Sequence, residues 1–428
     1  MDISPGRQNA DDFTSINGLH YYFEFIPAIA LSTGIPIFGG ASSIGMAISF
    51  PMMGFAYLIN QDIAFSVWVF YLLGLLVQTY FAVLGVTRGV TLDIYGQVDG
   101  GPIMAFVQFG ALVALVANTL WIARRRLASH LARAFGHRLA GADEDAASRA
   151  VVVQLGLGLA LMTGWLIATG IPWWASLTLV LAAVGTFLGI TRILCETGVA
   201  ATRAQLISGT VVKSLFGTAA LGGRGTVGAL ALSQVWMSDV RTFVMAAVAN
   251  GFKLTETVRR QGVVLTGMVL AVILAVVVSV WATIYLAYQV GANNASGWFF
   301  LAGPRYTVNF AAHFINNPVG PDVEGMGLMA VGASIMGALY WLRTHFPGFP
   351  LHPIGLAISQ INLTRSMWFS VFLVWLFKAI IIRYGGPRLL AAARPFFLGL
   401  ILGRFTVAAV WHLVDYLTGA TGHHLYGI

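Results

Sequence analysis

Charged side chains are scarce in this sequence. Asp, Glu, Lys and Arg make up 9% of its 428 residues, whereas hydrophobic residues make up 58%. A water-soluble domain carries roughly 25% charged residues, so this chain has too little charge to cover a surface that faces water. The composition excludes a soluble globular protein and predicts one embedded in a lipid bilayer, which we expect to be its main partner.

Cysteine and the signatures of common enzymes are also missing. Cys195 is the single cysteine, which excludes an intrachain disulfide and a thiolate metal cluster. The sequence contains no phosphate-binding GxxxxGKS or GxxxxGKT loop, no zinc-binding HExxH and no GxSxG nucleophile motif. We therefore expect no enzyme, no cofactor and no metal. The first two dozen residues lack a basic stretch followed by an apolar core, so no signal peptide is predicted.

The net charge of +8 comes from basic residues that lie between apolar runs. Arg124, Arg125 and Arg126 begin one cluster, and Arg259 and Arg260 belong to another. Short basic loops of this kind lie on the cytoplasmic side of membrane proteins. No basic face with interleaved aromatic residues occurs, so no nucleic-acid partner is expected. We expect an integral protein of the bacterial inner (cytoplasmic) membrane.

Long apolar runs recur along the chain, and a membrane-spanning helix needs about 20 mostly apolar residues. Eight clear runs are 65–86, 103–123, 150–169, 173–193, 263–290, 326–342, 367–382 and 395–417. Two weaker runs are 44–59 and 226–250. The expected fold is all-α: a polytopic helical membrane protein with about 10–12 transmembrane segments, some of them broken or re-entrant.

The expected organisation is a polar N-terminal segment with a partial hydrophobic element over 1–43, followed by a single transmembrane helical domain over 44–428. Within that domain, 124–149 is expected to be a basic cytoplasmic loop, because arginines crowd it. The stretch 291–325 is rich in Asn and Pro and is expected to be an extracytoplasmic loop.

Two stretches do not fit ordinary loops. If 124–149 is cytoplasmic, the basic residues after 226–250 and after 367–382 fall on the wrong side unless 199–221 and 346–364 each cross or half-cross the membrane. Both stretches are rich in polar residues, glycine or proline, and such backbone at membrane depth must be buried in protein or line a water-filled cavity. Discontinuous segments of this kind mark the binding sites of transporters. The alternative is that both are loops.

Polar and ionisable residues in and near these stretches are the candidate substrate-binding or coupling residues, since burying a lone charge in a bilayer is costly. They are Glu196, Arg203, Lys213, Asp239, Arg241, His352, Gln360, Asn362 and Arg365. Arg192 and Glu196 are four residues apart and share a helix face, which also fits a structural ion pair. Asp239 and Arg241 are two apart and cannot pair on one helix, so each needs a partner elsewhere.

Three residues near the C-terminal stretches have competing interpretations. His352 precedes Pro353, which favours a turn and fits either a proton-responsive group or a capping histidine. Lys378 lies near the end of an apolar run and is expected to extend to the membrane interface. His412 shares a helix face with Asp415, but no second cluster of ligands accompanies this pair, so it does not predict a metal site.

Several runs together resemble a known family: TRILCETGVAATRAQLISG, QVWMSDVRTFVMAAVANGFKL, SGWFFLAGP, FPLHPIGLAI, MWFSVFLVWLFKAIIIRYGG and RPFFLGLILGRF. From Ser49 to the C-terminus the chain is similar to an uncharacterised family of prokaryotic polytopic membrane proteins, a domain of unknown function. That family distantly resembles the oligopeptide transporter superfamily. The resemblance implies a many-helix permease with re-entrant or broken segments that moves peptides or metal chelates by proton coupling.

Two functions are therefore expected. The first is a secondary-transporter-like permease for proton-coupled uptake of peptides or related small solutes, with a cavity lined by 196–241 and 346–366. The second is a non-catalytic integral membrane subunit or scaffold of a larger membrane complex. A cavity lined by the candidate charges favours the first. The same charges paired in a dry core, with a large apolar face for a second copy or other chains, favour the second.

Overall fold

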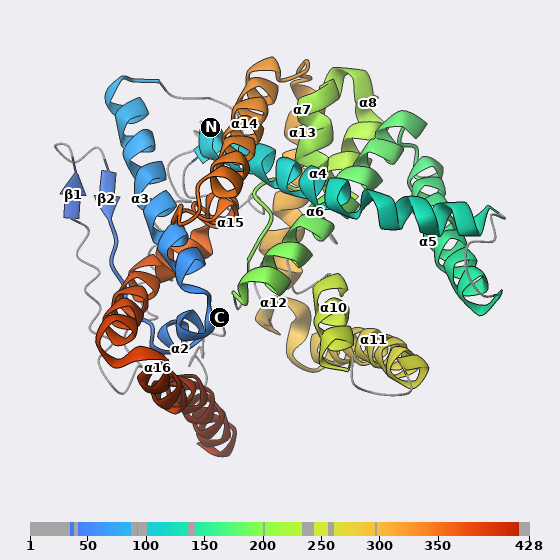
Figure 1. Cartoon of the computed structure of the whole chain (residues 1–428). Coiled ribbons are helices and arrows are strands. Elements are labelled where there is room, and N and C mark those ends of the chain that lie inside the picture. Colours follow the sequence, from blue (N-terminus) through green and yellow to red (C-terminus); the bar gives the residue numbers. More distant parts are fainter. Residues whose placement is uncertain are drawn as a thin grey trace, which may run out of the picture. The chain divides into compact units, whose positions relative to one another are not determined.

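The computed structural model is built of helices that run through most of the chain (Figure 1). The residues that it describes are 35–37, 42–86, 92, 101–135, 142–199, 202–232, 244–255, 261–295 and 298–418. Among these residues the strands are limited to a hairpin of β1 (Ile35–Ile37) and β2 (Ser42–Ile44), which pair antiparallel with Ile35 opposite Ile44. Apart from this hairpin the fold is all-α, as the apolar runs predicted.

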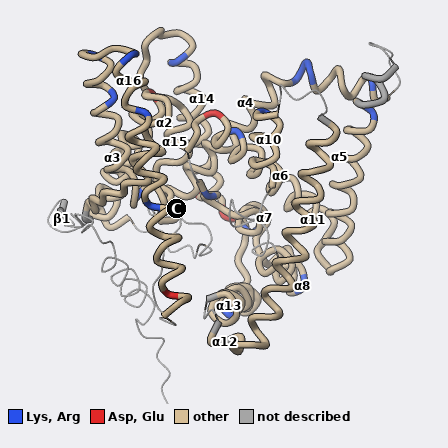
Figure 2. Tube along the Cα trace, turned by 90° about the horizontal axis from the view of Figure 1, so that it is seen from below, with Lys and Arg blue, Asp and Glu red and all other residues tan. Residues whose placement is uncertain are grey.

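Seven helices in the described residues are long and apolar enough to cross a membrane. They are α3 (Gln61–Val83), α4 (Gly101–Ala134), α5 (Ala142–Ala168), α6 (Trp173–Thr197), α11 (Gln261–Leu286), α14 (Val323–His345) and α16 (Asn362–Thr418). α16 contains two of the predicted runs, 367–382 and 395–417. Its backbone breaks between them at Gly386, where φ is +65° and ψ is −170°. Charged residues lie sparsely along these helices (Figure 2). The chain is a polytopic integral membrane protein.

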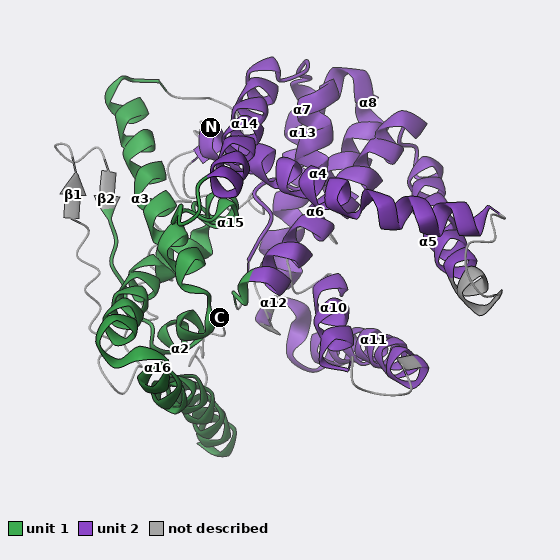
Figure 3. Cartoon of the chain, viewed as in Figure 1, with its two compact units in different colours: residues 1–87, 197–201, 346–428 green, residues 88–196, 202–345 purple. Residues whose placement is uncertain are grey.

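The chain folds into two compact units (Figure 3). Unit 1 contains residues 1–87, 197–201 and 346–428, and unit 2 contains residues 88–196 and 202–345. Unit 1 is therefore built mainly from the two ends of the chain, and unit 2 from its middle. Each unit has its own set of packed helices.

Unit 1 assembles on α16. The helices α2 (Phe50–Leu58) and α3 pack against α16, and the short α15 (Pro353–Ile358) packs against α3. Tyr57 of α2 stacks on Phe397 with ring centroids 4.0 Å apart, and its hydroxyl donates a hydrogen bond to the carbonyl of Leu390. A stacked ring pair and a hydrogen bond thus attach α2 to the part of α16 that follows Gly386.

Lys378 attaches α2 to the earlier part of α16. Its side chain is 6% exposed, and its Nζ donates to the carbonyl oxygens of Tyr57 at 3.0 Å and Ile59 at 2.6 Å. A helix leaves its last carbonyls without partners inside the helix, and they carry partial negative charge. The expectation that Lys378 extends to the membrane interface is therefore wrong, because its ammonium group caps the C-terminus of α2 inside the protein.

Unit 2 contains a close helix crossing between α4 and α14. A Cβ on Gly110 would overlap the carbonyl oxygen of Met329, and a Cβ on Gly332 would overlap that of Val107. Glycines on both helices thus let the two backbones touch, which is how helices associate inside membranes. α5 packs on α4, and a second core joins α5 and α6 to the shorter helices that follow them.

Those shorter helices are α7 (Ser208–Phe216), α8 (Thr218–Val227), the π-helical η2 (Gly228–Leu232), α10 (Met245–Leu254), η4 (Ala287–Gly291), α12 (Ala292–Ala295), η5 (Trp298–Ala302) and α13 (Gly303–Asn316). At 1.5 Å per residue, the nine residues of α7 are about 14 Å long, about half the thickness of a hydrocarbon core, whereas Gly222 interrupts α8. The predicted irregular stretch 199–221 therefore contains one helix of about half-crossing length. In 346–364, α15 has six residues and is about 9 Å long, which is less than a third of that thickness.

Two stretches expected to be loops are largely helical. α4 continues to Ala134 and α5 begins at Ala142, so much of 124–149 is helix. The Ala, Leu and Arg residues of this stretch are strong helix formers, which accounts for the difference. The stretch 291–325 contains α12, η5 and α13, because its buried Phe310 and Phe314 form an apolar helix face that packs in unit 2.

Candidate functional site

Residues 202–232 of unit 2, called the broken segment below, combine irregular backbone with many buried side chains. It begins with a non-helical stretch, 202–207, whose side chains are buried apart from the half-buried Arg203. α7 follows, and Gly217, with φ of +76°, separates α7 from α8. Gly222, with φ of +66°, then interrupts α8. Positive φ is easy only for glycine, so these glycines determine where the helix breaks.

The turn between α7 and α8 is held by the residues that precede α14. The amide of Asp322 donates to the carbonyl of Ser214 at 2.8 Å, and the amide of Ala219 donates to the carbonyl of Val319 at 3.1 Å. The amide of Val319 in turn donates to Thr218 Oγ1 at 3.0 Å. Backbone groups at the break are thus paired within unit 2, as irregular backbone at membrane depth requires.

Lys213 places a cation inside the broken segment. Its side chain is 4% exposed, and its Nζ lies 4.2 Å from the ring centroid of Phe314 and 5.4 Å from that of Phe310, both on α13. The negative ring faces attract the ammonium group. With Leu230 of η2 these two rings form one buried cluster. The broken segment therefore combines a buried charge with interrupted helices, a combination found at substrate and ion sites of membrane proteins.

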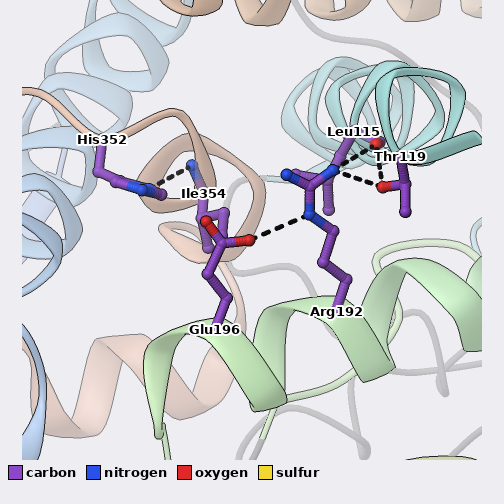
Figure 4. Close-up of polar contacts among 6 residues, drawn as sticks. All are labelled: Leu115, Thr119, Arg192, Glu196, His352 and Ile354. Atoms are coloured by element: carbon purple, nitrogen blue, oxygen red, sulfur yellow. Dashed lines mark hydrogen bonds and ion pairs between the residues drawn. The ribbon is translucent and has the colours of Figure 1, made fainter. Parts of the chain in front are cut away.

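Arg192 and Glu196 form the ion pair that their spacing allows (Figure 4). Arg192 Nε lies 3.0 Å from Glu196 Oε2, and Arg192 Nη1 also donates to the Leu115 carbonyl and to Thr119 Oγ1 of α4. The Glu196 side chain is 39% exposed. The guanidinium therefore ties α6 to α4, and this geometry fits the structural interpretation of the pair.

His352 and Gln360 lie together at α15 in unit 1. His352 is the N-cap of α15, and its Nδ1 accepts from the amide of Ile354 at 3.3 Å (Figure 4). Gln360 Nε2 donates to the Tyr71 carbonyl at 2.7 Å, and Gln360 Oε1 accepts from Gln78 Nε2 at 2.9 Å. Both side chains hold α15 and the turn after it in place, so His352 has the geometry of a capping histidine.

Asn362 and Arg365 follow α15 and the turn after it. Asn362 begins α16, and Arg365 lies in its first turn; both are exposed. Asp239 and Arg241 lie outside the described residues, so their expected partners stay predictions. Within the described residues, no group of three or more His, Cys, Asp or Glu is placed to hold a metal ion.

Two buried threonines of the broken segment were not singled out from the sequence. Thr202 is 2% exposed and Thr210 is 0% exposed. Among the described residues, the Oγ1 atom of neither has a hydrogen-bond partner. A serine or threonine near a helix start is common and normally caps the helix, so nothing in the local sequence marked these two.

Over residues 12–427 the chain matches the sequence model of the Family of unknown function (DUF6785). No curated protein and no solved structure matches the chain significantly. The expected resemblance to an uncharacterised family is thus confirmed, whereas these comparisons do not support the finer likeness to oligopeptide transporters.

Proposed function

We propose that this chain, which belongs to that family of unknown function, is a secondary-transporter-like permease that binds its solute at the broken segment. The observation that carries the proposal is the burial of interrupted backbone and a cation within unit 2. An ordinary spanning helix pairs all its backbone groups and needs no charge. The broken segment differs in both respects, because at the break it pairs backbone groups with residues outside its own helices and it buries the charge of Lys213, which fits a segment shaped by binding.

The lysines of the chain support this assignment by contrast. The sequence contains three lysines: Lys213, Lys253 and Lys378. Lys253 is exposed on α10, and Lys378 donates to two carbonyls that end a helix. Lys213 lies within a helix of nine residues, and its Nζ lies against the aromatic rings of α13. A buried cation in that setting is suited to contact a solute.

Proton-coupled uptake of peptides or related small solutes, across the bacterial inner membrane, is the specific form of the proposal. It rests on the distant resemblance to oligopeptide transporters in the sequence runs given above. The short helix α7, whose length is about half the thickness of a hydrocarbon core, is compatible with such a permease.

The proposal is tested by uptake into proteoliposomes with an inward proton gradient, using a panel of dipeptides, tripeptides and metal chelates. We expect the wild type to accumulate at least one of them and Lys213→Met to lower its rate by more than tenfold. Lys253→Met is the matched control and should retain the wild-type rate. Equal uptake by both variants would remove Lys213 from the site, and a folded wild type that accumulates nothing would favour the second function.

That second function is a non-catalytic subunit or scaffold, and α11 is the observation that favours it. The apolar window of α11 has no buried residue, and its main contacts are with the neighbouring η4 and α10. Almost the whole surface of this helix is therefore available to lipid or to another chain. Purification in a mild detergent tests this function, because a subunit should co-purify with a stoichiometric partner, whereas an independent permease should not.

A further inference from the structure

We infer that the N-terminal turn of α7 binds a carboxylate group, which is the recognition element of the transported solute. This inference rests on the proposed permease function but concerns a binding step that is measurable without transport. It is argued from three features of the broken segment: an uncapped helix start, a buried hydroxyl without a partner and a buried cation one turn further on.

The N-cap residue of α7 makes no side-chain capping hydrogen bond. The N-cap residue Ile207 has an extended backbone, with φ of −82° and ψ of 154°, and its side chain cannot accept a hydrogen bond. The first turn contains no acidic side chain. The first amides of a helix have no partner within the helix and carry partial positive charge, so they favour an anion. Buried residues surround this start on both sides, at 204–207 and 208–214.

The hydroxyl of Thr210 is the second, independent feature. Helical threonines of this chain normally donate to the carbonyl four residues earlier, as Thr79 does to Leu75 and Thr186 does to Ala182. Thr210 is fully buried, and its Oγ1 has no partner in the described residues. Because Cβ bonds tilt toward the helix N-terminus, this hydroxyl is directed toward the open first turn. A carboxylate there would accept the hydrogen bond that Thr210 Oγ1 lacks.

The charge at this turn selects the ligand class. Lys213 follows Thr210 by three residues and so lies on the same face of α7, buried at 4% exposure. A helix N-terminus adds roughly half a positive charge. The helix end and the ammonium group favour an anionic ligand, and a carboxylate is the anionic group of the peptides that the proposed permease would carry. Thr202 is buried in the stretch before α7, and its Oγ1 also has no partner in the described residues.

The test uses the purified full-length chain in lipid nanodiscs and acetate as the carboxylate probe. Thermal stability is measured in sodium acetate against sodium chloride at equal ionic strength, and against acetamide, the neutral isostere of acetate. We expect acetate alone to raise the melting temperature in a saturable manner. Thr210→Val should weaken the fitted dissociation constant by about tenfold, as expected for one hydrogen bond to a charged group. Thr186→Val, a buried threonine of α6 with a satisfied hydroxyl, should leave the constant unchanged.

Each outcome decides the inference. No stabilisation by acetate beyond that by chloride, or equal stabilisation by acetamide, overturns it. Stronger stabilisation by sodium phosphate overturns the choice of carboxylate. If Thr210→Val does not fold, Thr210→Ser keeps a hydroxyl and should retain binding, while Lys213→Met should abolish it. Acetate binding without uptake of any solute would preserve this inference and count against the permease, and uptake without acetate binding would do the reverse.

Discussion

Replacing Lys378 by methionine tests whether its ammonium group stabilises the end of α2 in unit 1. Lys378 lies on α16, and its ammonium group is held between the carbonyl oxygens of Tyr57 and Ile59 at the end of α2. Methionine has a similar length and is apolar, so it fills the same space without creating a cavity. The substitution therefore removes two hydrogen bonds and one charge while packing is largely kept.

The size of the effect follows from the two carbonyls. A buried acceptor left without a donor costs about 1–3 kcal/mol, so two of them cost about 2–6 kcal/mol. Removing a buried charge also relieves part of the cost of its desolvation, which lowers the net effect. We expect Lys378→Met to reduce the free energy of unfolding by about 2–4 kcal/mol. For a unit of this size, that corresponds to a fall in melting temperature of about 5–10 °C.

The assay is thermal unfolding of the purified protein in one detergent, followed by tryptophan fluorescence. Lys253→Met is the matched control, because Lys253 is exposed on α10 and its replacement should change stability by no more than about 0.5 kcal/mol. If Lys378→Met unfolds at the same temperature as Lys253→Met, the ammonium group does not stabilise the end of α2 and the reasoning is refuted.

Two further substitutions test the backbone features, each against a glycine with open space around it. Gly386→Ala should destabilise the protein by about 1–3 kcal/mol, because φ of +65° with ψ of −170° is strained for any side chain. Gly399→Ala on the same helix should be neutral, since nothing lies within 4 Å of an added Cβ. Equal melting temperatures for Gly386→Ala and Gly399→Ala would contradict the positive φ at Gly386. Gly332→Ala should cost about 1–3 kcal/mol by separating α14 from α4, whereas Gly327→Ala should not. A Gly332→Ala protein as stable as Gly327→Ala would show that the crossing is looser than described.

The eight clear apolar runs and one ion pair were predicted correctly from the sequence because both depend on local spacing, whereas the described residues contain seven candidate spanning helices rather than the 10–12 expected. Long apolar runs specify helices that face lipid, and residues four apart share a helix face, as Arg192 and Glu196 do. The positive-inside rule also located the irregular stretch that contains α7. The basic residues after 226–250 would lie on the wrong side of the membrane unless 199–221 crossed or half-crossed it, although no single residue marks the break.

The sequence did not predict which residues far apart along the chain contact one another. Lys378 is separated from Tyr57 by 321 positions, and no local pattern reveals that the end of α2 meets this part of α16. Gly110 and Gly332 pack two helices together, yet nothing near them distinguishes them from the other 47 of the 49 glycines. The missing partner of Thr210 likewise becomes visible only when the backbone around it is placed.

A comparison of the two buried lysines, Lys378 and Lys213, separates an effect on stability from an effect on binding within one chain. Lys378 neutralises carbonyls of the protein itself, so its replacement should lower the melting temperature and affect uptake only as far as folding is lost. Lys213 follows the start of α7 by about one turn and has aromatic rings against it, and methionine also packs well on such rings. Lys213→Met should therefore lower the melting temperature less than Lys378→Met does. It should also lose uptake and acetate binding. A reversed pattern, with Lys213→Met the less stable variant and acetate binding intact, would make Lys213 a structural residue and leave α7 without a ligand-binding role.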